Sequence, residues 1–330
     1  MKNELSKSDI IQVAENVWGM KHVFVNFYMI KNQEDNTWVL VDAGLKWSAS
    51  KIKSMAESLF GEDARPTAII LTHGHFDHAG SVAELADEWN VPVYAHFMEI
   101  PFLTGKSSYP PPDPSVGGGL MAKLSFTYPR GPINIWNHIN VLPSGGTLPG
   151  LSEWKYIHTP GHTPGHISLY REFDKVLIAG DAFVTTKAES ILSVLLQTKR
   201  ISGPPKYLTT DWVAAKESVN SLANLKPKVA ATGHGMPMRG VLLRDALLEL
   251  NQHFDEIAIP EQGRYVEEAA VADSNGFVYI PKAIPKNDNT IIVKAAALTA
   301  ALVCALFITT HKKNKKNKEH KYLLDFEYNF

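Results

Sequence analysis

The chain has 330 residues, which is enough for one large domain or two modest ones with a substantial core. Its 33 basic and 34 acidic side chains nearly balance, and residues 311–330 hold six lysines against three acids, so the rest of the chain is mildly acidic. This charge argues against a nucleic acid as partner and favours a small-molecule substrate. The single cysteine, Cys304, excludes an internal disulfide and a cysteine-rich zinc finger.

Strand and helix signals alternate along the first part of the chain. Apolar runs bounded by turn residues predict strands, and apolar residues at helical spacing predict helices. The predicted strands are 10–17, 23–30, 37–41, 68–71 and 91–95, and the predicted helices are 48–60 and 81–89. This order indicates an α/β or α+β domain.

Residues 101–150 differ from the sequence on either side. Prolines over 110–114 and glycines over 117–119 interrupt regular structure, which is typical of a surface loop or an active-site lid. The aromatic side chains of this insertion could line a substrate pocket or simply anchor a long loop: Phe102, Tyr109, Phe126, Tyr128 and Trp136.

Strand and helix signals also alternate along the second half of the chain. Strands are predicted at 154–158, 167–170, 175–179 and 229–232, and helices at 211–225 and 242–257, with Asp211 as an N-cap. We therefore expect a catalytic domain over 1–260, with 101–150 as a lid-like insertion, followed by a linker over 261–290.

The segment 291–310 is almost wholly apolar and precedes a lysine-rich tail over 311–330. About 20 such residues suffice to span a bilayer, so we expect a membrane-spanning C-terminal helix and a basic tail. The alternative is a terminal core helix with a disordered tail in a soluble cytoplasmic protein. No secretory signal precedes the domain, so the catalytic domain is expected on the cytoplasmic side.

Three histidines and a carboxylate lie within six residues, directly after the apolar run 68–71. These are His73, His75, Asp77 and His78. Imidazole and carboxylate are ligands that a divalent metal prefers, and the end of a strand holds them at fixed angles. The run therefore predicts a metal site.

Further residues of the same kinds follow other predicted strands. They are Asp42, His162, Asp181 and His234. Side chains from several strand ends on one rim can converge on a point, where three neutral imidazoles leave positions open for water, as in catalytic sites. A carboxylate such as Asp181 can bridge two metals about 3.5–4 Å apart.

On these residues the chain resembles the metallo-β-lactamase fold hydrolases over roughly residues 10–257. The run His73-x-His75-x-Asp77-His78 matches the signature of that family, and the other four residues match its remaining motifs in order. The resemblance implies an αββα four-layer sandwich that binds two Zn²⁺ ions, with Fe or Mn as alternatives. It also implies these roles: His73, His75 and His162 on the first metal; Asp77, His78 and His234 on the second; Asp181 between them; Asp42 hydrogen-bonded to a ligand.

The expected reaction is hydrolysis by a hydroxide that bridges the two metals, because bound Zn²⁺ lowers the pKa of water to about 7. Asp77 could orient the hydroxide or shuttle its proton. His166 is not needed to complete either metal and is expected beside the ligands. The run over 161–166 resembles glyoxalase II-like thioesterases, so the expected substrate is a small ester, thioester or lactone.

Other functions of the same fold stay open at this point. One is a mononuclear iron persulfide dioxygenase-like oxidoreductase, and another is a β-lactam or phosphodiester hydrolase. The remaining histidines of the domain have no motif support and are expected to be structural: His22, His96, His138, His158 and His253.

Overall fold

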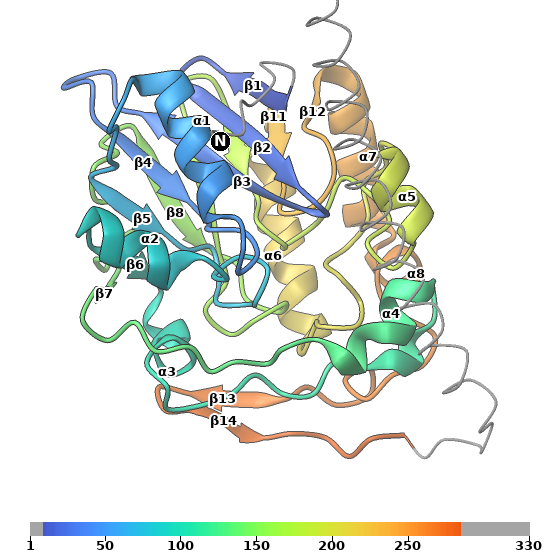
Figure 1. The fold of residues 1–330 in the computed structure, drawn as a ribbon. Coiled ribbons are helices and arrows are strands. Elements are labelled where there is room, and N and C mark those ends of the chain that lie inside the picture. Colours follow the sequence, from blue (N-terminus) through green and yellow to red (C-terminus); the bar gives the residue numbers. More distant parts are fainter. Residues whose placement is uncertain (1–8, 285–330) are drawn as a thin grey trace, which may run out of the picture. The chain divides into compact units, whose positions relative to one another are not determined.

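The structure of the protein is a computed structural model that describes residues 9–284 (Figure 1). The predicted membrane-spanning helix over 291–310 and the basic tail over 311–330 lie outside the described residues. Among the helices within 9–284, none has the length and apolar character that crossing a membrane requires.

Seven strands form the first sheet, in the same order as in the sequence. They are β1 (Ile10–Ala14), β2 (Val17–His22), β3 (Val25–Lys31), β4 (Trp38–Val41), β5 (Ala68–Ile70), β6 (Val93–Ala95) and β7 (Ile139–Val141). The pairs β1–β2, β2–β3 and β3–β4 are antiparallel, whereas the pairs β4–β5, β5–β6 and β6–β7 are parallel. The predicted strand 10–17 is in fact β1 and the start of β2, because the chain turns at Asn16, which has a φ of 59°.

Five strands form the second sheet, in the order β12-β11-β10-β9-β8. They are β8 (Trp154–His158), β9 (Ile167–Arg171), β10 (Val176–Ile178), β11 (Val229–Ala231) and β12 (Met238–Arg239). Only β10 and β11 are parallel to each other. The sequence did not predict β12, since two residues are too few for a recognisable pattern.

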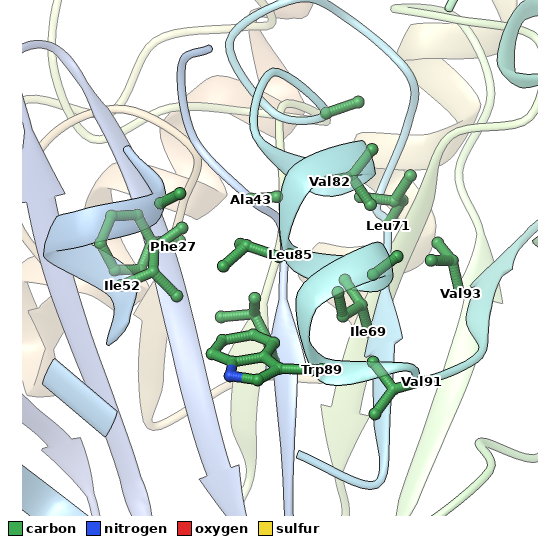
Figure 2. Packing of buried hydrophobic residues seen from close by; sticks show 14 of the residues in the cluster. Phe27, Ala43, Ile52, Ile69, Leu71, Val82, Leu85, Trp89, Val91 and Val93 are labelled. Atoms are coloured by element: carbon green, nitrogen blue, oxygen red, sulfur yellow. The ribbon is translucent and has the colours of Figure 1, made fainter. Parts of the chain in front are cut away.

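Helices cover the outer face of each sheet, which gives the predicted αββα order of layers (Figure 1). The helices α1 (Ala49–Phe60) and α2 (Val82–Trp89) pack on the first sheet, and α6 (Trp212–Asn224) and α7 (Gly240–Gln252) pack on the second. Figure 2 shows Leu85 and Trp89 of α2 beside Ile69 of β5. As predicted, Asp211 caps α6, its carboxylate accepting the Ala214 N–H at 2.9 Å.

The strand β3 shows why the layers stack in this way. Its residues alternate between two buried faces, so that Phe27 and Met29 face the helices while Tyr28 and Ile30 face the second sheet. A strand buried on both faces reads as a continuous apolar run, which is how residues 27–30 read in the sequence.

The insertion over 101–150 is more ordered than its prolines and glycines predicted. It holds α3 (Ile100–Leu103), α4 (Leu120–Leu124), two short 3₁₀ turns and β7, which extends the first sheet. Its aromatic side chains differ in burial, and only the buried ones match the expected role of anchoring the loop. Phe102 and Tyr109 are buried and stacked at 4.2 Å between ring centroids, whereas Phe126 and Trp136 are exposed.

The predicted linker over 261–290 is not a linker as far as it is described. The strands β13 (Val271–Asp273) and β14 (Gly276–Tyr279) form a hairpin, and the chain up to Ile284 belongs to one compact unit. Two aromatic side chains attach it to the insertion: the Tyr265 hydroxyl donates to the Pro111 carbonyl at 2.6 Å, and Phe277 packs 5.6 Å from Phe102. These anchors are single residues in a polar stretch, so no periodic pattern revealed them. Two further short helices, α5 (Ile191–Leu196) and α8 (Phe254–Ile257), complete the described chain.

Candidate metal centre

Every residue predicted to lie at the metal site follows the carboxyl end of a strand. Asp42 follows β4, His73 follows β5, Asp181 follows β10 and His234 follows β11, each within three residues. The loop after β8 carries His162. Parallel neighbours end at the same edge of a sheet, so the β4–β5 pair and the β10–β11 pair each bring two of these residues together.

The structure brings all seven predicted ligands into one buried cluster. Three groups of three residues each have their potential ligand atoms within 4.8 Å of one another. The groups are His73, His75 and His162; His73, His78 and Asp181; and Asp77, His78 and His234. Because the groups share members, the cluster has two adjacent positions that could each hold an ion.

Two threonines fix which ring nitrogen two of the histidines offer. The Thr72 hydroxyl donates to the Asp42 carboxylate at 2.8 Å and therefore accepts from His73 Nδ1, 3.0 Å away. In the same way, the Thr209 hydroxyl donates to a carbonyl and accepts from His162 Nδ1 at 3.2 Å. Both histidines consequently present an unprotonated Nε2 to the cluster.

Acceptor oxygens hold the Nδ1–H of two more histidines. His78 Nδ1 donates to Asp42 Oδ2 at 2.8 Å, and His234 Nδ1 donates to the Phe24 carbonyl at 2.8 Å. Asp42 is held in turn, since it accepts the Thr72 N–H at 2.8 Å and has a left-handed φ of 61°. This agrees with the expected role of Asp42 as a hydrogen-bond partner of a ligand.

Several buried polar atoms of the cluster have no hydrogen-bond partner among residues 9–284. They are His73 Nε2, His78 Nε2, Asp77 Oδ1 and Asp181 Oδ1. In addition, His75 Nδ1 lies 3.0 Å from His162 Nε2, a distance at which one proton or one cation can join the two nitrogens. Buried polar groups are normally satisfied, so this donor set fits a divalent metal ion.

Asp181 lies between the two positions. Its Oδ2 is 3.5 Å from His162 Nε2, 3.6 Å from His78 Nε2 and 3.1 Å from His234 Nε2. One carboxylate therefore faces histidines from both groups, as a bridging ligand would.

The histidines of the first group are held neutral. Burial, followed by neighbouring histidines, lowers the pKa of His73 and of His162 well below the ordinary value, and burial lowers that of His75 to about 3. These three rings therefore carry no positive charge near neutral pH that would repel a metal.

In the group of Asp77, His78 and His234, the pKa values of the histidines are raised. Burial alone would lower the pKa of His78 and of His234, but Asp181 and other carboxylates raise both above the ordinary value. Burial raises the pKa of Asp77, and the histidines beside Asp181 hold the pKa of that carboxyl well below its usual range. A metal at this position would have to displace protons.

His166 has no nitrogen free for a metal. Its Nε2 accepts the Asp181 N–H at 2.8 Å, and its Nδ1 lies 2.9 Å from the Thr159 hydroxyl. It therefore positions Asp181. The histidines predicted to be structural are absent from the three groups found in the described part of the chain: His22, His96, His138, His158 and His253.

Sequence reasoning missed a buried carboxylate next to the cluster. Glu99 is fully buried and bonded to both loops that carry the first group of histidines, and Tyr109 joins it. The one signal in the sequence is a lone acid inside an apolar run over 97–103.

Two packed sheets with a cluster of histidines and aspartates at their strand ends define the class of protein. The chain matches the family model of the Metallo-beta-lactamase superfamily over residues 20–234 and belongs to that superfamily.

Individual relatives agree with this assignment. The chain is 46% identical over 247 residues to a Bacillus subtilis (strain 168) protein named Probable metallo-hydrolase YflN, a match that covers 74% of this chain and 94% of the relative. It is 27% identical over 211 residues to Probable metallo-hydrolase YybB of the same organism, covering 64% and 80%. Among solved structures, the metallo-beta-lactamase family protein TTHA1429 from Thermus thermophilus is similar in fold, with a TM-score of 0.52, 20% identity, and coverage of 74% and 81%.

Proposed function

We propose that this protein is a dinuclear zinc-dependent hydrolase that acts on a small ester, thioester or lactone. The observation that supports this most directly is the set of buried polar atoms that have no hydrogen-bond partner within residues 9–284: Nε2 of His73 and His78 and Oδ1 of Asp77 and Asp181. The name of the B. subtilis relative, which the match covers almost completely, supports the hydrolase class.

We assign the ligands to two positions. The first metal position is formed by His73, His75 and His162. The second metal position is formed by Asp77, His78 and His234, and Asp181 is a ligand at both. The two-position assignment is supported by the overlap of the three ligand groups and by the contacts of Asp181 with histidines of both.

Bound at these positions, two zinc ions would supply a water that ionises near neutral pH and positive charge to stabilise an oxyanion. The protein residues have separate tasks. Asp42 and Thr72 hold the rings of His78 and His73 in place through their Nδ1 atoms. The free Oδ1 of Asp77 is available to orient a water or to take its proton, which is the role we assign to it.

Aromatic side chains beside Asp77 favour a substrate with an uncharged acyl part. Phe76 packs against Tyr128 at 5.4 Å between ring centroids, and Tyr128 packs against Tyr207 at 5.7 Å. Burial, together with the charge of Asp77, raises the pKa of Tyr128, so its phenol stays neutral at physiological pH. Neutral, largely apolar side chains close to Asp77 suit an ester, thioester or lactone.

Metal analysis combined with a substrate panel tests the proposal. Purified full-length protein should contain two zinc ions per chain and should hydrolyse at least one member of a panel of thioesters and lactones faster than β-lactams and phosphodiesters. One iron per chain together with oxygen consumption on a persulfide would overturn it in favour of the oxidoreductase.

For residues 291–310 we propose membrane attachment, which is supported by their composition alone. Cell fractionation of the full chain and of a chain ending at Ile284 should place only the full chain with the membranes. Equal distribution of the two proteins would contradict this.

A further inference from the structure

We propose that Glu99 is a positioning residue for the first metal position, an inference that rests on the ligand assignment in the proposed function. Glu99 ends the short 3₁₀ turn Phe97–Glu99 after β6 and is completely buried. Its carboxylate joins the loop that carries His73 and His75 to the loop that carries His162.

One oxygen of Glu99 holds the first loop. Gly74, which lies between His73 and His75, donates its N–H to Glu99 Oε2 at 2.9 Å. The Tyr109 hydroxyl donates to the same oxygen and lies 2.9 Å from the Gly74 nitrogen. The Tyr109 ring also packs against His75, with 4.4 Å between the ring centroids.

The other oxygen of Glu99 holds the second loop. Glu99 Oε1 accepts the Thr163 hydroxyl at 2.8 Å and the Gly165 N–H at 2.8 Å. Thr163 directly follows His162, so both oxygens act close in sequence to a proposed ligand. Four donors on one buried carboxylate make this link strong, because hydrogen bonds to a charged group are stronger than those between neutral groups.

The two glycines in these loops are required by the approach of Glu99 and Tyr109. A Cβ at Gly165 would lie 2.7 Å from Glu99 Cγ, and a Cβ at Gly74 would lie 2.6 Å from the Tyr109 hydroxyl oxygen. Each glycine therefore lets its N–H reach the carboxylate, and the spacing between His73, His75 and His162 depends on that contact.

The second metal position has other supports. Its histidines are oriented by Asp42 and by the Phe24 carbonyl, and Glu99 has no hydrogen bond with either of these or with His78 or His234. A change at Glu99 should consequently weaken metal binding at one position and leave the other nearly unaffected. A merely structural role would not produce this selectivity.

The substitution Glu99→Gln keeps the size of the side chain and turns one oxygen into an amide nitrogen. That nitrogen would face either Gly74 N–H or Gly165 N–H, neither of which can accept, so one loop loses its backbone hydrogen bond to residue 99. Zn²⁺ alone is the probe, titrated against a chromophoric chelator. The full chain carries either His234→Ala, to isolate the first position, or His162→Ala, to isolate the second.

We expect Glu99→Gln to weaken zinc binding 10–100-fold in the His234→Ala background and by less than about threefold in the His162→Ala background. Equal losses in both backgrounds, or no loss in the first, would overturn the inference while leaving the proposed function intact. Failure of the unsubstituted chain to bind zinc would instead overturn the proposed function and this inference with it.

Asp113→Asn provides a matched control. Asp113 is also a buried loop-holding carboxylate, which accepts from Ser115 N at 2.9 Å and from the Arg264 N–H, but it touches no ligand loop. In both backgrounds, the protein with Asp113→Asn should bind zinc as tightly as the protein without this substitution. If Glu99→Gln does not fold, Tyr109→Phe removes one donor and should give a smaller loss with the same selectivity; equal losses at both positions would refute the inference.

Discussion

Replacing Asp42 by asparagine should disable the second metal position without disturbing the fold. The Asp42 carboxylate accepts three donors: the N–H and hydroxyl of Thr72 and Nδ1 of His78. An asparagine oxygen at Oδ1 can keep the Thr72 N–H at 2.8 Å and the hydroxyl at 3.1 Å. Its amide nitrogen, however, would lie 2.8 Å from His78 Nδ1 with two donors opposed.

His78 can resolve this conflict by moving its proton from Nδ1 to Nε2, which is the atom we assign to the metal. The second position would then lose one of its ligands. Disrupting such a partner costs about 10–100-fold in metal affinity, which corresponds to about 1.4–2.7 kcal/mol. The first position, whose histidines are oriented by Thr72 and Thr209, should keep its affinity.

Zinc titration of the Asp42→Asn protein against a chromophoric chelator measures both affinities. Asp87→Asn is the matched control, because Asp87 also pairs with a histidine nitrogen, His138 Nε2 at 2.7 Å, but on the surface and away from the cluster. If Asp42→Asn binds two zinc ions as tightly as the unsubstituted chain, the tautomer argument is wrong.

Three further predictions concern the site and the core. His75→Ala should reduce bound zinc from two ions per chain to one and abolish hydrolysis, as measured by metal analysis and the substrate assay; full activity would refute the site. Leu85→Ala, at a completely buried position, should lower the free energy of unfolding by about 2–5 kcal/mol in urea denaturation, whereas Leu242→Ala, at a position with 73% exposure, should change it by less than about 0.5 kcal/mol. Burial lowers the pKa of His166 from 6.5 to about 3, so between these pH values the unfolded chain binds a proton at His166 that the folded chain does not bind. The contribution of this group to the free energy of unfolding is therefore present above pH 6.5 and is lost as the pH falls. Between pH 6.5 and 5.5, the free energy of unfolding of the metal-free protein should fall by about 1 kcal/mol less in His166→Gln than in the unsubstituted chain. An unchanged dependence of the free energy of unfolding on pH would contradict this.

The main strands and helices were accessible from the sequence because they have clear periodicity, whereas the αββα order of layers was implied by the resemblance to the metallo-β-lactamase fold. The run over β5 and the helical spacing of α2 predict both elements within two residues at each end. Elements without a pattern of their own were missed, such as β12 and the hairpin of β13 and β14. Their stability comes from tertiary contacts, such as Phe277 against Phe102, rather than from local propensity.

The residues of the buried cluster were also predictable, since each is a histidine or aspartate placed shortly after an apolar strand. Sequence spacing could not decide their protonation. Asp181 keeps the pKa of His78 and His234 high, whereas His75 and His162 are held neutral by burial, and these neighbours come from four different strand ends.

The sequence by itself determined the chemical types of the proposed metal ligands, because strand ends and the identity of each side chain are local properties. Only the tertiary structure decided which nitrogen each histidine offers and how the two ligand loops are joined. Both features depend on hydrogen bonds of Thr72, Thr209 and Glu99, most of which join segments that lie far apart in the chain. No local pattern marks such residues, since their role exists only once the two sheets have packed together.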